Sequence, residues 1–113
     1  NLPGPFTFIL NSGHHAPSFV KHKGKTLGLR IPHHKVVKSL MDKLDTPLMV
    51  SSVMQEDDVE PYYNDAEELI RVFEKVVGFV VIDPEIMQEV STVVDMTGEE
   101  VEIVRAGKLD LVL

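Results

Sequence analysis

Apolar residues gather in short runs along most of the chain, and polar or glycine- and proline-containing segments separate these runs. Short runs that are rich in β-branched or aromatic residues, or that alternate apolar and polar positions, are typical of strands. In the run 26–31, alternation places the two leucines on one face and Thr26, Gly28 and Arg30 on the other. The pattern predicts strands at residues 6–10, 26–31, 47–52, 79–82, 92–95 and 102–105.

Two longer segments have the apolar spacing of helices. Residues 33–44 predict a helix with one apolar face, and residues 65–77 predict a second. Asp65 is expected to cap the second helix, and Glu68 three residues later forms a pair that resembles a capping box. The expected inward positions are Val36, Val37, Leu40, Met41 and Leu44 in the first helix, and Leu69, Ile70, Phe73, Val76 and Val77 in the second.

Strands and helices therefore alternate, which indicates an α/β or α+β fold with a mixed sheet. The last two strands flank Thr97 and Gly98, a pair that predicts a hairpin. Residues 55–64 form an acidic loop that is too short to be a linker, so we expect one domain. The chain begins at Asn1 and enters a β-like run by Phe6, which indicates a processed chain or part of a longer polypeptide.

Composition narrows the classes of function. The 113 residues carry a net charge of −7, so phosphate or RNA contacts need a local basic patch. The absence of cysteine excludes disulfides, thiolate nucleophiles and cysteine-based zinc sites. No apolar run approaches membrane-spanning length and no signal-peptide pattern is present, so we expect a cytoplasmic protein without a membrane partner.

The histidines are the first candidates for chemistry. Adjacent histidines in a doublet point in different directions, and no carboxylate lies at a helical ligand spacing, so we expect exposed side chains and no tightly bound metal such as zinc. They are His14, His15, His22, His33 and His34.

Other polar residues suggest an anion site. Lysines 21, 23 and 25 form a basic cluster with His22 and Arg30, and for the lysines this predicts either a phosphate contact or a solvated loop. Arg30 lies in a predicted strand, where a buried or half-buried guanidinium needs an anionic partner. Ser51 and Ser52 follow another predicted strand, where hydroxyls either bind a phosphate or carboxylate or simply cap the strand.

A set of short motifs carries a family resemblance. The segments are LPGPFTFIL at 2–10, TLGLRIP at 26–32, PLMVSS at 47–52, STVVD at 91–95 and IVRAG at 103–107. In this order and spacing they resemble the motifs of the YrdC/YciO family. The resemblance implies a twisted mixed sheet with flanking helices, like that of YrdC and RibB, of which residues 1–113 would be the C-terminal part and the N-terminal part would be absent.

The resemblance also implies a function. Synthases of this family make threonylcarbamoyl-AMP from L-threonine, bicarbonate and ATP with Mg²⁺, for the modification of tRNA. The resemblance therefore implies either such a synthase-like activity or an action on the modified nucleoside. By resemblance, Thr26, Ser52, Val53 and Arg105 would bind the nucleotide, and Arg30, Ser51 and Ser91 would bind threonine. Such a site would act by positioning and charge neutralisation without a covalent nucleophile.

One departure selects a branch of the family. Met54 stands where the synthases have asparagine, and a thioether cannot replace an amide as a hydrogen-bonding group. This resembles the YciO branch and favours the alternative of a non-catalytic module that binds tRNA or double-stranded RNA. We also expect the 113 residues alone to be inactive, and either unstable or dimeric, because sheet edges and apolar faces would be left uncovered.

Overall fold

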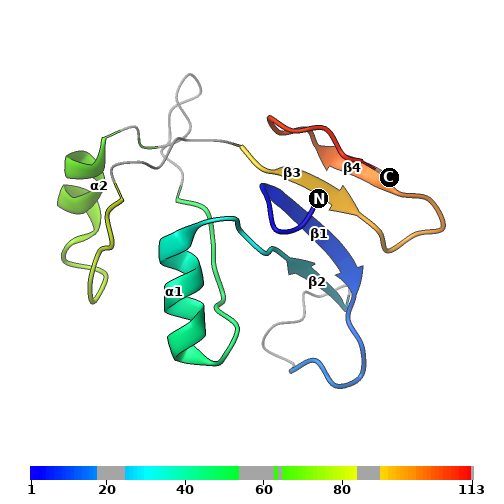
Figure 1. The fold of residues 1–113 in the computed structure, drawn as a ribbon, viewed down its shortest axis with the longest axis horizontal. Coiled ribbons are helices and arrows are strands. Elements are labelled where there is room, and N and C mark those ends of the chain that lie inside the picture. The colour runs from blue at the N-terminus through cyan, green and yellow to red at the C-terminus, as the bar shows by residue number, and fades with distance from the viewer. Residues whose placement is uncertain (18–24, 54–62, 64, 84–89, 113) are drawn as a thin grey trace. The chain divides into compact units, whose positions relative to one another are not determined.

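The computed structural model describes residues 1–17, 25–53, 63, 65–83 and 90–112. The chain divides into two compact units, one of Asn1–Leu48 with Glu89–Leu113 and one of Met49–Gln88. The first unit, called here the sheet unit, holds four strands and one helix, and the second holds the other helix (Figure 1). The elements are β1 (Phe6–Asn11), β2 (Thr26–Leu29), α1 (Lys35–Leu44), α2 (Ala66–Phe73), β3 (Thr92–Asp95) and β4 (Glu102–Arg105).

The four strands form one mixed sheet in the order β2-β1-β3-β4. β1 pairs antiparallel with β2 and parallel with β3, and β3 pairs antiparallel with β4 (Figure 1). The antiparallel β3–β4 pair confirms the predicted hairpin around Thr97. The parallel pair joins segments far apart in sequence, as parallel strands require a crossover connection. The expected α+β class with a mixed sheet is confirmed.

One face of the sheet is apolar and contains the core of the unit. Cross-strand partners lie on the same face, and Phe8 is in register with both Leu29 and Val94. Val94 is fully buried, Phe6 is 4% exposed, and the rings of Phe6 and Phe8 stack with centroids 6.2 Å apart. This face therefore excludes water mainly along β1 and β3, the two central strands.

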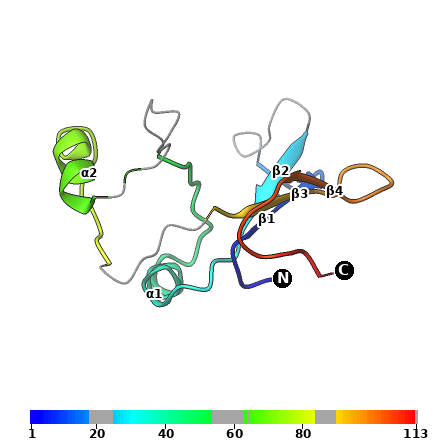
Figure 2. The ribbon, with the colours of Figure 1, turned by 90° about the horizontal axis from the view of Figure 1, so that it is seen from above.

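The ends of the sheet unit are tied together. Asn1 Nδ2 donates to Val112 O at 2.6 Å, and Val112 N donates to Asn1 Oδ1 at 3.0 Å. Figure 2 shows the N- and C-terminal segments side by side beneath the strands. This reciprocal pair closes the unit although the two residues are at opposite ends of the chain.

The helices form where the apolar spacing predicts them, but their apolar faces remain accessible. α1 spans Lys35–Leu44 and none of its residues is buried; Leu40 and Leu44 are exposed. α2 ends at Phe73, earlier than the predicted Val77, and both Val76 and Val77 are exposed. Two β-branched residues and Gly78 follow Glu74, and such residues lower helix propensity.

The N-terminus of α2 has the expected cap. Asp65 Oδ1 accepts a hydrogen bond from Glu67 N at 2.9 Å, which satisfies one free amide of the first turn. Glu68, expected to complete a capping box, instead lies 3.7 Å from Arg71 in an exposed ion pair. Within the described parts of the chain, no helix is long and apolar enough to cross a membrane.

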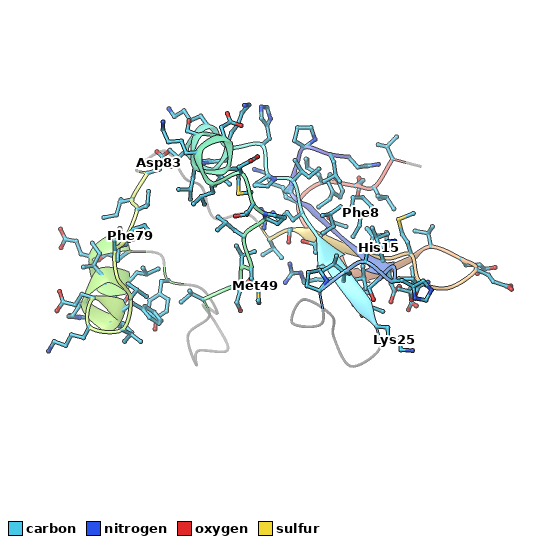
Figure 3. All side chains as sticks on the ribbon, turned by 90° about the horizontal axis from the view of Figure 1, so that it is seen from below. Phe8, His15, Lys25, Met49, Phe79 and Asp83 are labelled. Carbon is cyan, nitrogen blue, oxygen red and sulfur yellow. The ribbon has the colours of Figure 1, made fainter. Side chains whose placement is uncertain are left out.

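Two predicted strands are wrong. Residues 47–52 and 79–82 have strand-like composition, yet neither segment forms a strand. Met49 is 72% exposed, Val50 76% and Phe79 78%; Figure 3 labels Met49 and Phe79. A strand needs a hydrogen-bonded neighbour, and no described residue pairs with either run. The predicted acidic loop at 55–64 lies mostly outside the described residues.

Candidate functional site

The face of the sheet opposite Phe8 carries polar side chains, and we call it the polar face. Thr7 is in register with Val93, and Val93 with Arg105, so these residues share one row across three strands. The rows toward the other end of the strands contain Asn11 with Thr26, and Asp95 with Glu102. This face therefore combines hydroxyl, carboxylate and guanidinium groups.

Arg30 extends this face beyond the end of β2. It follows Leu29, the last residue of the strand, and alternation continued by one residue puts it on the face of Gly28. The chain stays beside the start of β1 here, since Gly4 N donates to Ile31 O at 2.8 Å. Continued alternation thus puts Arg30 on the face of Arg105, at strands that lie three strand spacings, or about 14 Å, apart.

The environment of Arg30 differs from the prediction. Its side chain is exposed, and it lies just past the strand rather than within it. Among the described residues, no carboxylate forms an ion pair with its guanidinium. Water therefore solvates this charge, and no buried anion is needed to balance it.

Gly28 has no side chain, so the surface of the sheet beside Arg30 is not raised at this position. A Cβ built at Gly28 would lie 3.7 Å from Thr7 Cγ2, which places the Thr7 side chain over this position. A glycine within a strand often marks a place where a ligand or another backbone approaches closely. The low surface lies between Thr26, which is half-buried, and Arg30.

Arg105 and Ser91 are joined directly. Arg105 Nε and Nη2 donate to Ser91 O at 3.1 and 2.9 Å, and Nη2 also donates to Ser91 Oγ at 2.8 Å. Ser91 is 6% exposed, whereas the strand that carries Arg105 is exposed along its length. The guanidinium thus covers a buried serine with one edge.

A second set of bonds supports this pair. Thr92 Oγ1 donates to Leu109 O at 2.8 Å and accepts from Gly107 N at 3.0 Å, and Thr92 is 2% exposed. A Cβ at Gly107 would lie 2.3 Å from Val90 O and 2.5 Å from Thr92 N, so only glycine fits. The segments STVVD and IVRAG are therefore joined by two bonded pairs, Ser91 with Arg105 and Thr92 with Gly107. We call this set of hydrogen bonds the lock.

Thr7, Thr92 and Gly107 were not predicted as residues of the site. The alternation of β1 indicates the face of Thr7, but its neighbours depend on the register with β2 and β3. The bonds of Thr92 and Gly107 have no local signal in the sequence, because they join two segments that meet only when β3 pairs with β4.

Ser51, Ser52 and Val53 belong to the second unit. All three are exposed in a coil, and Ser51 Oγ lies 3.5 Å from Ser52 O. The prediction that these hydroxyls follow a strand is wrong, because no strand forms there. Met54 lies outside the described residues.

Asp95 is a carboxylate of the polar face, and its pKa is lowered. Its Oδ1 accepts from Thr97 Oγ1 at 2.7 Å and from Thr97 N at 2.8 Å. These bonds, the side-chain one first, favour the charged form and lower the pKa of Asp95 below its usual value of 3.8. Asp95 therefore holds the turn that leads into β4.

The described residues contain no group of three histidine, aspartate or glutamate side chains that could hold a metal ion. His14, His15 and His33 are exposed as predicted, and His34 is half-buried at the start of α1. His22 lies outside the described residues. The prediction about a tightly bound metal therefore stays a prediction.

Two hollows lie elsewhere on the described surface. One of about 440 Å³ is lined by residues at the start of α2, and one of about 330 Å³ lies between the first residues and the segment after β4. Neither is lined by a predicted site residue. The candidate site is therefore the polar face, with Arg30, Thr26, Ser91 and Arg105 on it.

Comparison with known proteins agrees with this arrangement of motifs. A family model of the Sua5, YciO and YrdC proteins, described as telomere recombination, matches residues 1–107. An uncharacterized protein of Haemophilus influenzae is 34% identical over 108 residues, which cover 95% of this chain and 52% of that protein. YciO of Escherichia coli, also uncharacterized, is 31% identical over 112 residues, covering 98% of this chain and 54% of YciO.

More distant and structural matches extend the comparison. A threonylcarbamoyl-AMP synthase of Coxiella burnetii is 34% identical over 71 residues, covering 63% of this chain and 37% of that enzyme. The crystal structure of Escherichia coli YciO superposes with a TM-score of 0.84 at 30% identity, covering 96% of this chain and 52% of YciO. The chain spans about half the length of the YciO-type relatives that it matches. On the match to nearly its whole length, the chain belongs to the Sua5/YciO/YrdC family.

Proposed function

We propose that the polar face binds a nucleotide together with an amino-acid carboxylate, and that the protein acts in threonylcarbamoyl chemistry of tRNA. Arg30 pairs with the carboxylate of L-threonine, since a guanidinium offers two parallel donors. Thr26 and Arg105 contact the nucleotide, and Ser91 contacts the threonine side. For Ser51, Ser52 and the backbone of Val53, which belong to the second unit, a role in ligand binding rests on the family resemblance alone.

One observation carries this proposal. Thr26, Arg30, Ser91 and Arg105 come from three separate segments. The register of the sheet puts Thr26 and Arg105 on the polar face, Arg30 follows β2 by alternation, and Ser91 is bonded to Arg105, which supports a shared site. Two guanidiniums at strands that lie about 14 Å apart suit an extended ligand with an anionic group at each end. The 34% identity to a threonylcarbamoyl-AMP synthase supports the choice of ligand.

The proposed reaction needs only positioning and charge neutralisation. The threonine amine adds to bicarbonate with loss of water to give a carbamate. A carbamate oxygen then attacks the α-phosphorus of ATP, and pyrophosphate leaves with the electron pair of the broken P–O bond. Arginines at the two ends stabilise the carboxylate and the phosphate, and no enzyme nucleophile is required.

The test is release of pyrophosphate by the full-length protein from MgATP, L-threonine and bicarbonate. We expect release only when all three are present, and Arg30→Lys should raise the KM for threonine about tenfold, because lysine loses the paired donors. Arg71→Lys, at an exposed arginine of α2, is the matched control and should leave KM unchanged. Absence of release, together with salt-dependent RNA binding, would overturn the synthase form of the proposal.

A module that binds tRNA or double-stranded RNA is the second candidate. Lys25 and Arg30, both exposed, flank the two ends of β2, and Figure 3 labels Lys25. Met54, in place of the synthases' asparagine, also favours this function over catalysis. Lys25→Ala should weaken binding of a double-stranded RNA and reduce the salt slope by about one, as expected for one lost phosphate contact. Lys43→Ala, at the exposed end of α1, is the control.

A further inference from the structure

The bonds between Arg105 and Ser91 restrict the direction of the serine hydroxyl. Ser91 Oγ accepts from Arg105 Nη2 at 2.8 Å, so one lone pair of the hydroxyl is used. A serine hydroxyl has one proton to donate and two acceptor positions. In the described part of the chain no group accepts that proton. With Arg105 in place, the hydroxyl is left as a donor directed away from the guanidinium.

The guanidinium of Arg105 also has N–H donors that no described residue uses. Its Nε and Nη2 are engaged with Ser91 O and Oγ, while no described residue accepts from Nη1. An arginine carries five N–H donors and no acceptor. Ser91 Oγ–H and Arg105 Nη1–H are therefore both donors without an acceptor among the described residues, and the Nη2–Oγ bond holds the two side chains together. Such a pair suits an oxygen atom with negative charge, as in a carboxylate, carbamate or phosphate.

We propose that Arg105 is a positioning residue that orients the Ser91 hydroxyl, so that the two residues present one donor pair to a single oxyanion of the ligand. This inference rests on the proposed function and deepens it. Ser91 contacts the threonine side and Arg105 contacts the nucleotide, and the oxyanion that they share is a group at the junction of these two parts.

A purely structural lock is the competing explanation, and the bonding pattern separates the two. Two of the three bonds from Arg105 end on the main-chain oxygen of Ser91, which alanine also has. Ser91→Ala thus keeps most of the lock but removes the hydroxyl donor. Ser91→Thr keeps both. A structural role alone predicts that neither variant changes ligand binding.

The experiment is isothermal titration of the full-length protein with ATP, L-threonine and inorganic phosphate, each separately. Variants are Ser91→Ala, Ser91→Thr, Arg105→Lys and the Ser91→Ala/Arg105→Lys double variant, with thermal melting as the check on folding. We expect Ser91→Ala to weaken binding of at least one probe about tenfold with little change in Tm, and Ser91→Thr to restore it. Arg105→Lys should weaken that probe similarly, and the double variant should be no weaker than the worse single variant, because the residues act as one unit.

Each outcome decides a different claim. Unchanged binding in Ser91→Ala overturns the inference while binding of ATP or threonine by the wild type upholds the proposed function. Independent, multiplying effects of the two substitutions also overturn the inference, because Arg105 would then act without Ser91. Binding of phosphate alone, lost in Ser91→Ala, supports the inference and contradicts the proposed ligands. A wild-type protein that binds none of the probes overturns both.

Discussion

The sheet unit and the segment 49–83 have similar apolar patterns but different outcomes. Residues 92–95 and 102–105 were predicted as strands and pair as β3 and β4 within those bounds. Residues 47–52 and 79–82 are as apolar, yet they form no strand. Val94 is fully buried, while Val50 is 76% exposed. An apolar run thus becomes a buried strand only where a neighbouring segment supplies its hydrogen bonds and its packing.

The largest expected effect concerns the 113 residues by themselves. With Met49, Val50, Phe79 and Val81 exposed, we expect this chain alone to unfold readily or to dimerise, whereas the full-length protein should not. Sedimentation velocity and thermal melting of both proteins measure this. A monodisperse 113-residue monomer with a cooperative melt would contradict it.

A methyl group at Gly107 should strongly destabilise the sheet unit. The added Cβ would lie 2.3 Å from Val90 O in the lock between β3 and β4, so the backbone must move. We expect Gly107→Ala to cost about 3 kcal/mol of the free energy of unfolding. Gly78→Ala in the second unit, where a Cβ meets nothing within 4 Å, should change stability little in urea unfolding of the full-length protein.

Valine-to-alanine substitutions compare the two regions directly. Val94→Ala removes two fully buried methyl groups and should cost about 2 kcal/mol. Val50→Ala removes exposed methyl groups and should cost close to nothing. Equal losses in the two variants of the full-length protein would show that segment 49–53 is buried there, and the contrast between the regions would disappear.

The smallest expected effect is the acid dependence of stability through Asp95. Its pKa is lowered in the folded protein by the bonds from Thr97, so its contribution is present above the unfolded value, near 3.9, and is lost as pH falls through the lower folded pKa. Asp95→Asn should flatten the fall in stability below about pH 4. An acid slope that Asp95→Asn leaves unchanged would contradict this role of the bonds from Thr97.

Much of the fold follows from local pattern. Helices α1 and α2 begin within two residues of their predicted starts, because apolar spacing and the Asp65 cap are properties of neighbouring residues. The turn at Thr97 and the strands on either side of it are equally local. The family resemblance rests on such short segments as well, and the match over residues 1–107 confirms it.

The polar face depends on contacts that are distant in sequence. Thr26 and Arg105 are far apart along the chain, and they share a face only because β1 pairs with β2 on one side and with β3 on the other. The bond between Ser91 and Arg105 likewise requires the shift in register between β3 and β4. Side-chain alternation reveals which residues of one strand share a face, but hydrogen bonding between strands establishes which faces combine. For this reason the chain's own pattern was enough for its helices, for the four strands of the sheet and for its family, whereas the rejection of two further strands and the arrangement of the candidate site emerged only from the folded structure.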